Sequence, residues 1–189
     1  MKFLRQNIHL ILRLFVNQLG ITFFGLVLTM AVSQMENDTF KLLVSLFSIV
    51  FYLFLIYSVM WEAGAKNAIP IETGRMKKDP LFSLKASLWA SVPNLVLGAL
   101  MTVFCLVFYM FDAAWADSVH TAIYVITGFA EAMYLGLFSS LLGTLEGGVQ
   151  DAVKCLLYLF SSLPMILVSV GSYALGIRNI HLFGGKAKK

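Results

Sequence analysis

Residues 41–85, KLLVSLFSIVFYLFLIYSVMWEAGAKNAIPIETGRMKKDPLFSLK, determine the fold class of this chain. The part 41–61 contains a single charged residue, Lys41 at its start, and has the length of a helix that crosses a bilayer, which needs about 20 apolar residues. The part 62–85 is the longest hydrophilic segment and holds five bases against three acids. An apolar run followed by a basic connector is typical of a multi-pass membrane protein.

The composition excludes a water-soluble globular domain. Of the 189 residues, 59% are hydrophobic and 13% are charged, whereas soluble domains are about 25% charged. The mean hydropathy is +0.83. We therefore predict a single, all-α, polytopic membrane domain built as a helical bundle.

The same alternation of apolar and polar segments recurs along the whole chain. It predicts four full spans at 15–34, 41–61, 87–111 and 155–177. A fifth apolar segment, 119–143, contains the acidic residue Glu131 and several glycines, and we predict that it is re-entrant or tilted. The remaining parts are a basic interfacial segment 1–14, the basic loop 62–85 and a basic tail 178–189.

The distribution of Lys and Arg predicts the orientation. Cytoplasmic connectors are enriched in these residues. The protein is therefore expected in a bacterial plasma membrane, with the N-terminus and the loop 62–85 on its cytoplasmic side. Four spans place the basic tail on the same side, whereas five spans place it outside. The charge count favours four spans, and five spans stay as the alternative.

Two stripes of small residues recur at every fourth position, so the members of a stripe share a helix face if the helix is continuous. Membrane helices associate through such small residues because these allow close backbone packing. The stripes predict tight packing, either within one chain or between two copies in a homo-oligomer. Each stripe has five members, with Asn94 in the first and Thr144 at the end of the second. The helix-packing positions among them are Ala86, Ala90, Gly98 and Thr102 in the first stripe, and Gly128, Ala132, Gly136 and Ser140 in the second.

Glu131 is the only acid inside an apolar segment, and with Asn94 it forms the candidate intramembrane polar site. A charge at the bilayer centre costs about 2.5–3.5 kcal/mol on insertion scales, so such residues face a cavity or a partner. One interpretation is a proton or cation site. The other is that the segment is re-entrant and places Glu131 near external water. Asn94 follows Pro93 in the third span. We expect its side chain to form hydrogen bonds with another helix or with the carbonyls that the proline leaves unpaired, rather than to bind a ligand.

Basic residues form a candidate cytoplasmic face. Such a face can attract anionic lipid headgroups, an acidic protein or RNA, or it can serve only to set the topology. Its members are Arg75, Lys77, Lys78, Lys85, Arg178, Lys186, Lys188 and Lys189.

No catalytic or metal-binding motif is found. The three histidines, His9, His120 and His181, are far apart in the sequence, and Cys105 and Cys155 are expected to be packing residues. We predict no catalytic residue, no metal ligand and no cofactor, and we do not expect an enzyme.

The stretches WEAGAKNAIPIETGRMKKDPLFSLKASLWASVPNLVLG (61–98) and SYALGIRNIHLF (172–183) resemble uncharacterised small polytopic membrane proteins of Gram-positive anaerobes. The resemblance covers about 50 residues and implies no activity. In size and basic character the chain is also similar to the membrane protein that binds the large OLE noncoding RNA in some of these bacteria, and no residue roles follow from that.

Three functional hypotheses follow. The first is a non-enzymatic scaffold or accessory subunit of a membrane complex. The second is a small transporter or channel component that uses Glu131. The third is a membrane adaptor that binds RNA or anionic lipid through its basic face.

Overall fold

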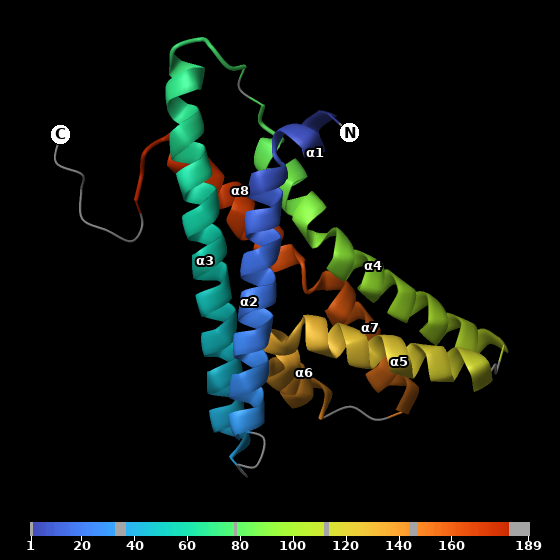
Figure 1. Ribbon diagram of the computed structural model, residues 1–189. Helices are drawn as coiled ribbons and strands as arrows, with labels where there is room; N and C mark the ends of the chain where they lie inside the picture. The colour runs from blue at the N-terminus through green and yellow to red at the C-terminus, as the bar shows by residue number, and fades with distance from the viewer. Residues whose placement is uncertain (1, 33–36, 78, 112–113, 144–146, 182–189) are drawn as a thin grey trace. The chain divides into compact units, whose positions relative to one another are not determined.

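The computed structural model describes residues 2–32, 37–77, 79–111, 114–143 and 147–181. Every regular element in these ranges is a helix (Figure 1). The helices are α1 (Lys2–Gln6), α2 (Ile8–Val32), α3 (Asp38–Glu72), α4 (Phe82–Phe111), α5 (Ala114–Ala130), the 3₁₀ helix η1 (Ala132–Tyr134), α6 (Leu135–Leu142), α7 (Gly147–Phe160) and α8 (Leu163–Ile177).

Within the described residues, four helical segments are long and apolar enough to cross a membrane. They are Ile8–Val32, Thr39–Glu72, Phe82–Phe111 and Val149–Ile177. A fifth segment, Trp115–Ala130 with Ala132–Leu142, passes the same test only as a pair of helices bent by 86°. The prediction of an all-α bundle with four full-length apolar helices and an irregular fifth segment is therefore confirmed, and the helices are compatible with a multi-pass membrane protein.

Most of the apolar surface of these helices faces outward. In the most hydrophobic part of Thr39–Glu72, 33% of the residues are buried inside the protein, and the corresponding share for Phe82–Phe111 is 22%. Side chains such as Phe23, Met110 and Leu167 are more than two-thirds exposed. A surface of this kind is stable when lipid covers it.

The chain divides into two compact units. The first comprises Met1–Asn17, Leu53–Ala90 and Pro164–Lys189. Within it, α3 packs on α8 through Gly64 and Gly176, and the indole N–H of Trp61 donates to the carbonyl of Ile180 at 2.8 Å. The side-chain amide of Asn67 donates to the hydroxyl of Tyr173 at 3.1 Å. These contacts fix the part of α3 that follows its apolar run.

The second unit comprises Gln18–Tyr52 and Ser91–Leu163. Within it, α2 and α3 run side by side (Figure 1), with the rings of Phe24 and Phe51 5.8 Å apart. Gly25 of α2 lies against the backbone of Met133 in η1, and Gly98 of α4 lies against that of Leu159 in α7. Both candidate sites described below lie in this unit.

The helix bounds differ from the predicted segments at all four spans. The helix α2 begins at Ile8, inside the predicted interfacial segment 1–14. The helix α3 continues through 62–72, the first half of the predicted basic loop, and passes Pro70 before it ends. This stretch contains three alanines, which favour a helix, and Pro70 removes a single backbone donor two residues before the helix ends. The turn after it uses Gly74 at a φ of +71°, which glycine adopts without strain.

The other two differences concern the third and fourth spans. The helix α4 begins at Phe82, five positions before the predicted 87, because the Asp79 side chain accepts a hydrogen bond from the N–H of Leu81 and caps the first turn. The predicted span 155–177 is interrupted at Ser161 and Ser162, just before Pro164, which cannot donate a helical hydrogen bond.

Candidate functional site

Glu131 lies at the break between α5 and η1. Its backbone has φ −123° and ψ 32°, outside the helical range. Its N–H still donates to the carbonyl of Thr127 at 2.9 Å, and its carbonyl accepts from the N–H of Tyr134 at 2.9 Å. The break therefore redirects the chain by 86° without leaving the backbone of Glu131 itself unpaired.

Side chains from two other helices stabilise this break. The hydroxyl of Thr22 in α2 donates to the carbonyl of Ala130 at 2.8 Å. The hydroxyl of Ser45 in α3 donates to the carbonyl of Met133 at 3.0 Å and accepts from the N–H of Leu137 at 3.0 Å. In a regular helix this carbonyl and this N–H, four residues apart, would bond to each other, and the hydroxyl of Ser45 bridges them instead. Irregular backbone at membrane depth is tolerated where neighbouring groups satisfy it in this way.

The carboxyl group of Glu131 is fully buried, with 0% of the residue exposed. The side chains of Asn94 and Ser161 lie near it and interact with it electrostatically, as do the phenols of Tyr52, Tyr134 and Tyr158. Among the described residues, neither carboxyl oxygen has a hydrogen bond of good geometry, and neither does the hydroxyl of Tyr134. We call Glu131 and these five neighbours the Glu131 site.

The environment of Glu131 differs from what one of the two interpretations of the sequence predicted. A re-entrant segment was expected to leave Glu131 near external water, whereas the structure buries its carboxyl group among protein side chains. Asn94 is buried as well, with 7% exposed, and contributes to the same site although it lies on α4. The structural role expected for Asn94 stays a prediction.

The small-residue stripes occupy different environments. A Cβ atom at Gly98 would lie 3.0 Å from the Cα of Leu159, and one at Gly136 would lie 2.8 Å from the Cβ of Ser45. Thr102 donates its hydroxyl to the carbonyl of Gly98 at 2.8 Å. Ala86, Ala90, Gly128 and Ala132 are buried, whereas Ser140 is exposed. Because the 86° bend separates Gly128 from Gly136, the second stripe does not form one continuous helix face.

The predicted basic face lies partly in the first unit. Arg75, Lys77 and Arg178 are exposed there. Lys85 forms an ion pair with Asp79 at 2.8 Å and lies over the ring of Phe3. The hydrogen bond from Lys85, and then that from the N–H of Leu81, lower the pKa of Asp79. The other predicted members, Lys78, Lys186, Lys188 and Lys189, lie outside the described residues.

Sequence reasoning missed a second cluster of reactive side chains in the second unit. Cys105 of α4, His120 of α5 and Cys155 of α7 come together although 15 and 35 positions separate them in the chain. No short motif signals such a cluster, since each residue comes from a different helix. Only the packing of α4, α5 and α7 reveals it.

No protein-family model matches the chain, and no curated protein or solved structure is significantly similar to it.

Proposed function

We propose that the protein is a small transporter or channel component of a bacterial plasma membrane, in which Glu131 binds and releases a proton. One observation carries the proposal: a fully buried carboxyl group lies at an 86° break in an apolar segment. Asn94 and Ser161 lie beside it, but none of the described residues gives its oxygens a hydrogen bond of good geometry.

The physical reason is the cost of burying an unpaired charge. A carboxylate removed from water without a partner is expensive, and binding a proton or a cation removes that cost. Broken helices at membrane depth recur in transporters because the break exposes a site in the middle of the protein. Glu131 combines both features, and the hydroxyl groups of Tyr134 and Ser161 beside it can form part of a proton path.

The scaffold hypothesis has less support. A homodimer formed through the small-residue stripes requires Gly98 and Gly136 to be free to meet a second copy. Both are instead packed against Leu159 and Ser45 of the same chain. Packing within one chain therefore accounts for these two positions without a partner.

The adaptor hypothesis likewise has no specific contact in its favour. Of the four described members of the basic face, Lys85 is already paired with Asp79. Arg75, Lys77 and Arg178 are exposed, as expected for residues that only set the topology.

In the proposed orientation the N-terminus and the connector between α3 and α4 face the cytoplasm, and the chain crosses the membrane four times. The α5–η1–α6 segment then enters from the outer side and returns to it, with Glu131 at its bend. The 86° bend fits this path and fits a broken span equally well. The basic tail supports the re-entrant path, because four crossings place its Lys and Arg residues in the cytoplasm.

Proton flux into proteoliposomes tests the proposal. The purified protein is reconstituted with a pH-sensitive dye inside, and a potassium diffusion potential drives protons inward. Flux above that of protein-free liposomes is expected, and Glu131→Gln is expected to abolish it because an amide cannot exchange the proton. Glu72→Gln, the same substitution at an exposed position, serves as the control and should leave the flux unchanged. Absence of flux in the wild type, or equal flux in wild type and Glu131→Gln, contradicts the proposal.

A further inference from the structure

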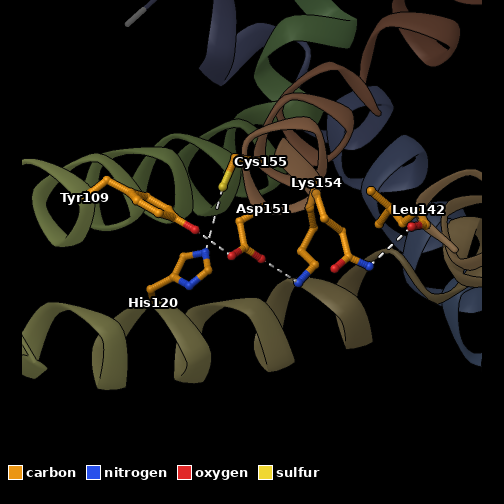
Figure 2. A network of polar contacts seen from close by, with 7 residues as sticks. Tyr109, His120, Leu142, Asp151, Lys154 and Cys155 are labelled. Carbon is orange, nitrogen blue, oxygen red and sulfur yellow. Dashed lines mark hydrogen bonds and ion pairs between the residues drawn. The ribbon is translucent and has the colours of Figure 1, made fainter. Parts of the chain in front are cut away.

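Cys105, His120 and Cys155 form a compact three-residue cluster that shares no residue with the Glu131 site. The Sγ atom of Cys155 lies 3.8 Å from Nε2 of His120 (Figure 2). One ligand atom from each residue can be chosen such that all three lie within 4.8 Å of one another. The cluster is shielded from solvent, since Cys105, His120 and Cys155 are 6%, 9% and 2% exposed.

The distances between these ligand atoms are close to the distances between the ligand atoms around a bound metal ion. Zinc binds thiolate sulfur at about 2.3 Å and imidazole nitrogen at about 2.0–2.1 Å, so a tetrahedral site places sulfur and nitrogen about 3.6 Å apart and two sulfurs about 3.8 Å apart. The observed 3.8 Å between Cys155 and His120 already fits, and the most distant pair in the cluster has to close by at most about 1 Å. Small side-chain rotations are enough for that.

Charge favours a divalent ion in this environment. Two thiolates and a neutral imidazole carry a charge of about −2, which a divalent ion cancels, so the occupied site is neutral and inexpensive to bury. A monovalent copper ion would leave one net negative charge. The neighbouring Asp151 and Lys154 cannot provide that balance, because they form an ion pair with each other at 3.3 Å.

Side chains around the cluster are arranged to support it. Asp151 interacts electrostatically with both His120 and Cys155. Its carboxylate accepts hydrogen bonds from the hydroxyl of Tyr109 at 2.8 Å and from the ammonium of Lys154 at 3.3 Å (Figure 2). The ammonium of Lys154 also lies 4.4 Å from the ring centre of Tyr124. The Asp151 side chain is 35% exposed, so the edge of the cluster is open to water. A polar outer shell and an entry path are both features of metal sites in proteins.

We propose that Cys105, His120 and Cys155 bind one Zn²⁺ ion per chain, through two thiolates and Nε2 of the imidazole, with water in the fourth position beside Asp151. Binding releases the two thiol protons to solvent. The proposal is independent of the function assigned to Glu131, because none of the three residues belongs to the Glu131 site.

The test uses the purified full-length protein in detergent, reduced and stripped with a chelator. Titration with Co²⁺, which takes the place of Zn²⁺ and absorbs light, is expected to saturate at one ion per chain with a sulfur-to-metal charge-transfer band. Zn²⁺ should displace it and abolish the band. X-ray absorption of the Zn²⁺-loaded wild type should give two sulfur neighbours and one imidazole nitrogen, a result that requires no variant to fold.

Variants locate the site. Cys105→Ser and Cys155→Ser should each lose the charge-transfer intensity of one thiolate, and His120→Ala should weaken binding at least tenfold. The matched control His9→Ala, at an exposed histidine of the first unit, should bind as the wild type does. The proposal is overturned if the reduced wild type binds less than one Zn²⁺ per chain, if it binds Cu⁺ but not Zn²⁺, or if the two cysteines form a disulfide and no metal binds after its reduction.

Discussion

Gly64 of α3 and Gly176 of α8 lie at a helix crossing where each glycine faces the backbone of the other helix. A Cβ atom at Gly64 would meet the carbonyl oxygen of Tyr173, and a Cβ atom at Gly176 would meet that of Trp61. This is the small-residue packing expected in membrane helices, but at positions outside the two stripes visible in the sequence. The crossing holds the C-terminal half of α3 against α8 within the first unit.

Gly176→Ala is expected to destabilise the protein by about 1–3 kcal/mol, because the added methyl group forces the two backbones apart. Gly171→Ala is the matched control in the same helix, since a Cβ atom there meets nothing within 4 Å. It should be neutral or slightly stabilising, as alanine favours a helix over glycine. Reversible unfolding in mixed detergent micelles measures both, and equal stability of the two variants would show that the crossing contributes nothing.

The second stripe provides another matched pair. Gly136→Ala should be destabilising, because its Cβ atom would lie 2.8 Å from that of Ser45, whereas Gly128→Ala should be tolerated, because the nearest atoms are 3.7 Å away. The same unfolding measurement distinguishes them. Equal costs would mean that the close approach of Gly136 to Ser45 does not limit the side chain at position 136.

Ser45→Ala is expected to cost about 1–3 kcal/mol, since it removes the hydroxyl that bridges the carbonyl of Met133 and the N–H of Leu137 at the helix break. Ser58→Ala, on an exposed part of the same helix, removes only a bond to the carbonyl of Phe54 and should change stability little. Unfolding free energies of the two variants give the comparison. A loss at Ser58 as large as that at Ser45 would argue against the bridging role.

Asp79 predicts a pH dependence of stability. The pKa of its carboxyl group is lower in the folded protein than the ordinary value of 3.8, so the carboxylate stabilises the folded state above that pH. Protonation removes this contribution as the pH falls through the lowered value. Asp79→Asn keeps an oxygen acceptor for the N–H of Leu81 but loses the charge opposite Lys85.

The variant is therefore expected to be less stable than the wild type at about pH 7 and about pH 5, and the difference should close below about pH 4. Thermal unfolding followed by circular dichroism across this range measures it. A difference that stays constant down to about pH 3 would mean that the charge of Asp79 does not contribute.

The sequence predicted the helical elements well because apolar run length and charge placement are local properties. The runs 41–61 and 87–111 lie inside α3 and α4, and the bend in 119–143 falls in the segment predicted to be irregular. Helix ends were predicted less well. The continuation of α3 past Pro70 depends on contacts such as those of Trp61 and Asn67 with the C-terminal part of the chain, which no local pattern encodes.

The candidate sites were predicted only in part for the same reason. Glu131 stands out in the sequence because it is an acid in an apolar run, but the burial of its carboxyl group depends on the packing of α3, α4 and α7 around it. Cys105 and Cys155 look like ordinary apolar positions, and only the placement of His120 between their helices makes them a cluster. Residues that act together across helices leave no spacing signal in the sequence.

We propose that the chain crosses the membrane four times and that the bent α5–η1–α6 segment, with Glu131 at its corner, enters and leaves on one side. The side of the C-terminus tests it most directly. A fluorescent reporter that matures only in the cytoplasm, and a phosphatase that is active only outside, are each fused after Lys189 in otherwise identical chains. Our account predicts fluorescence without phosphatase activity. With the N-terminus in the cytoplasm, phosphatase activity without fluorescence would mean an odd number of crossings, and would contradict the re-entrant path of this segment.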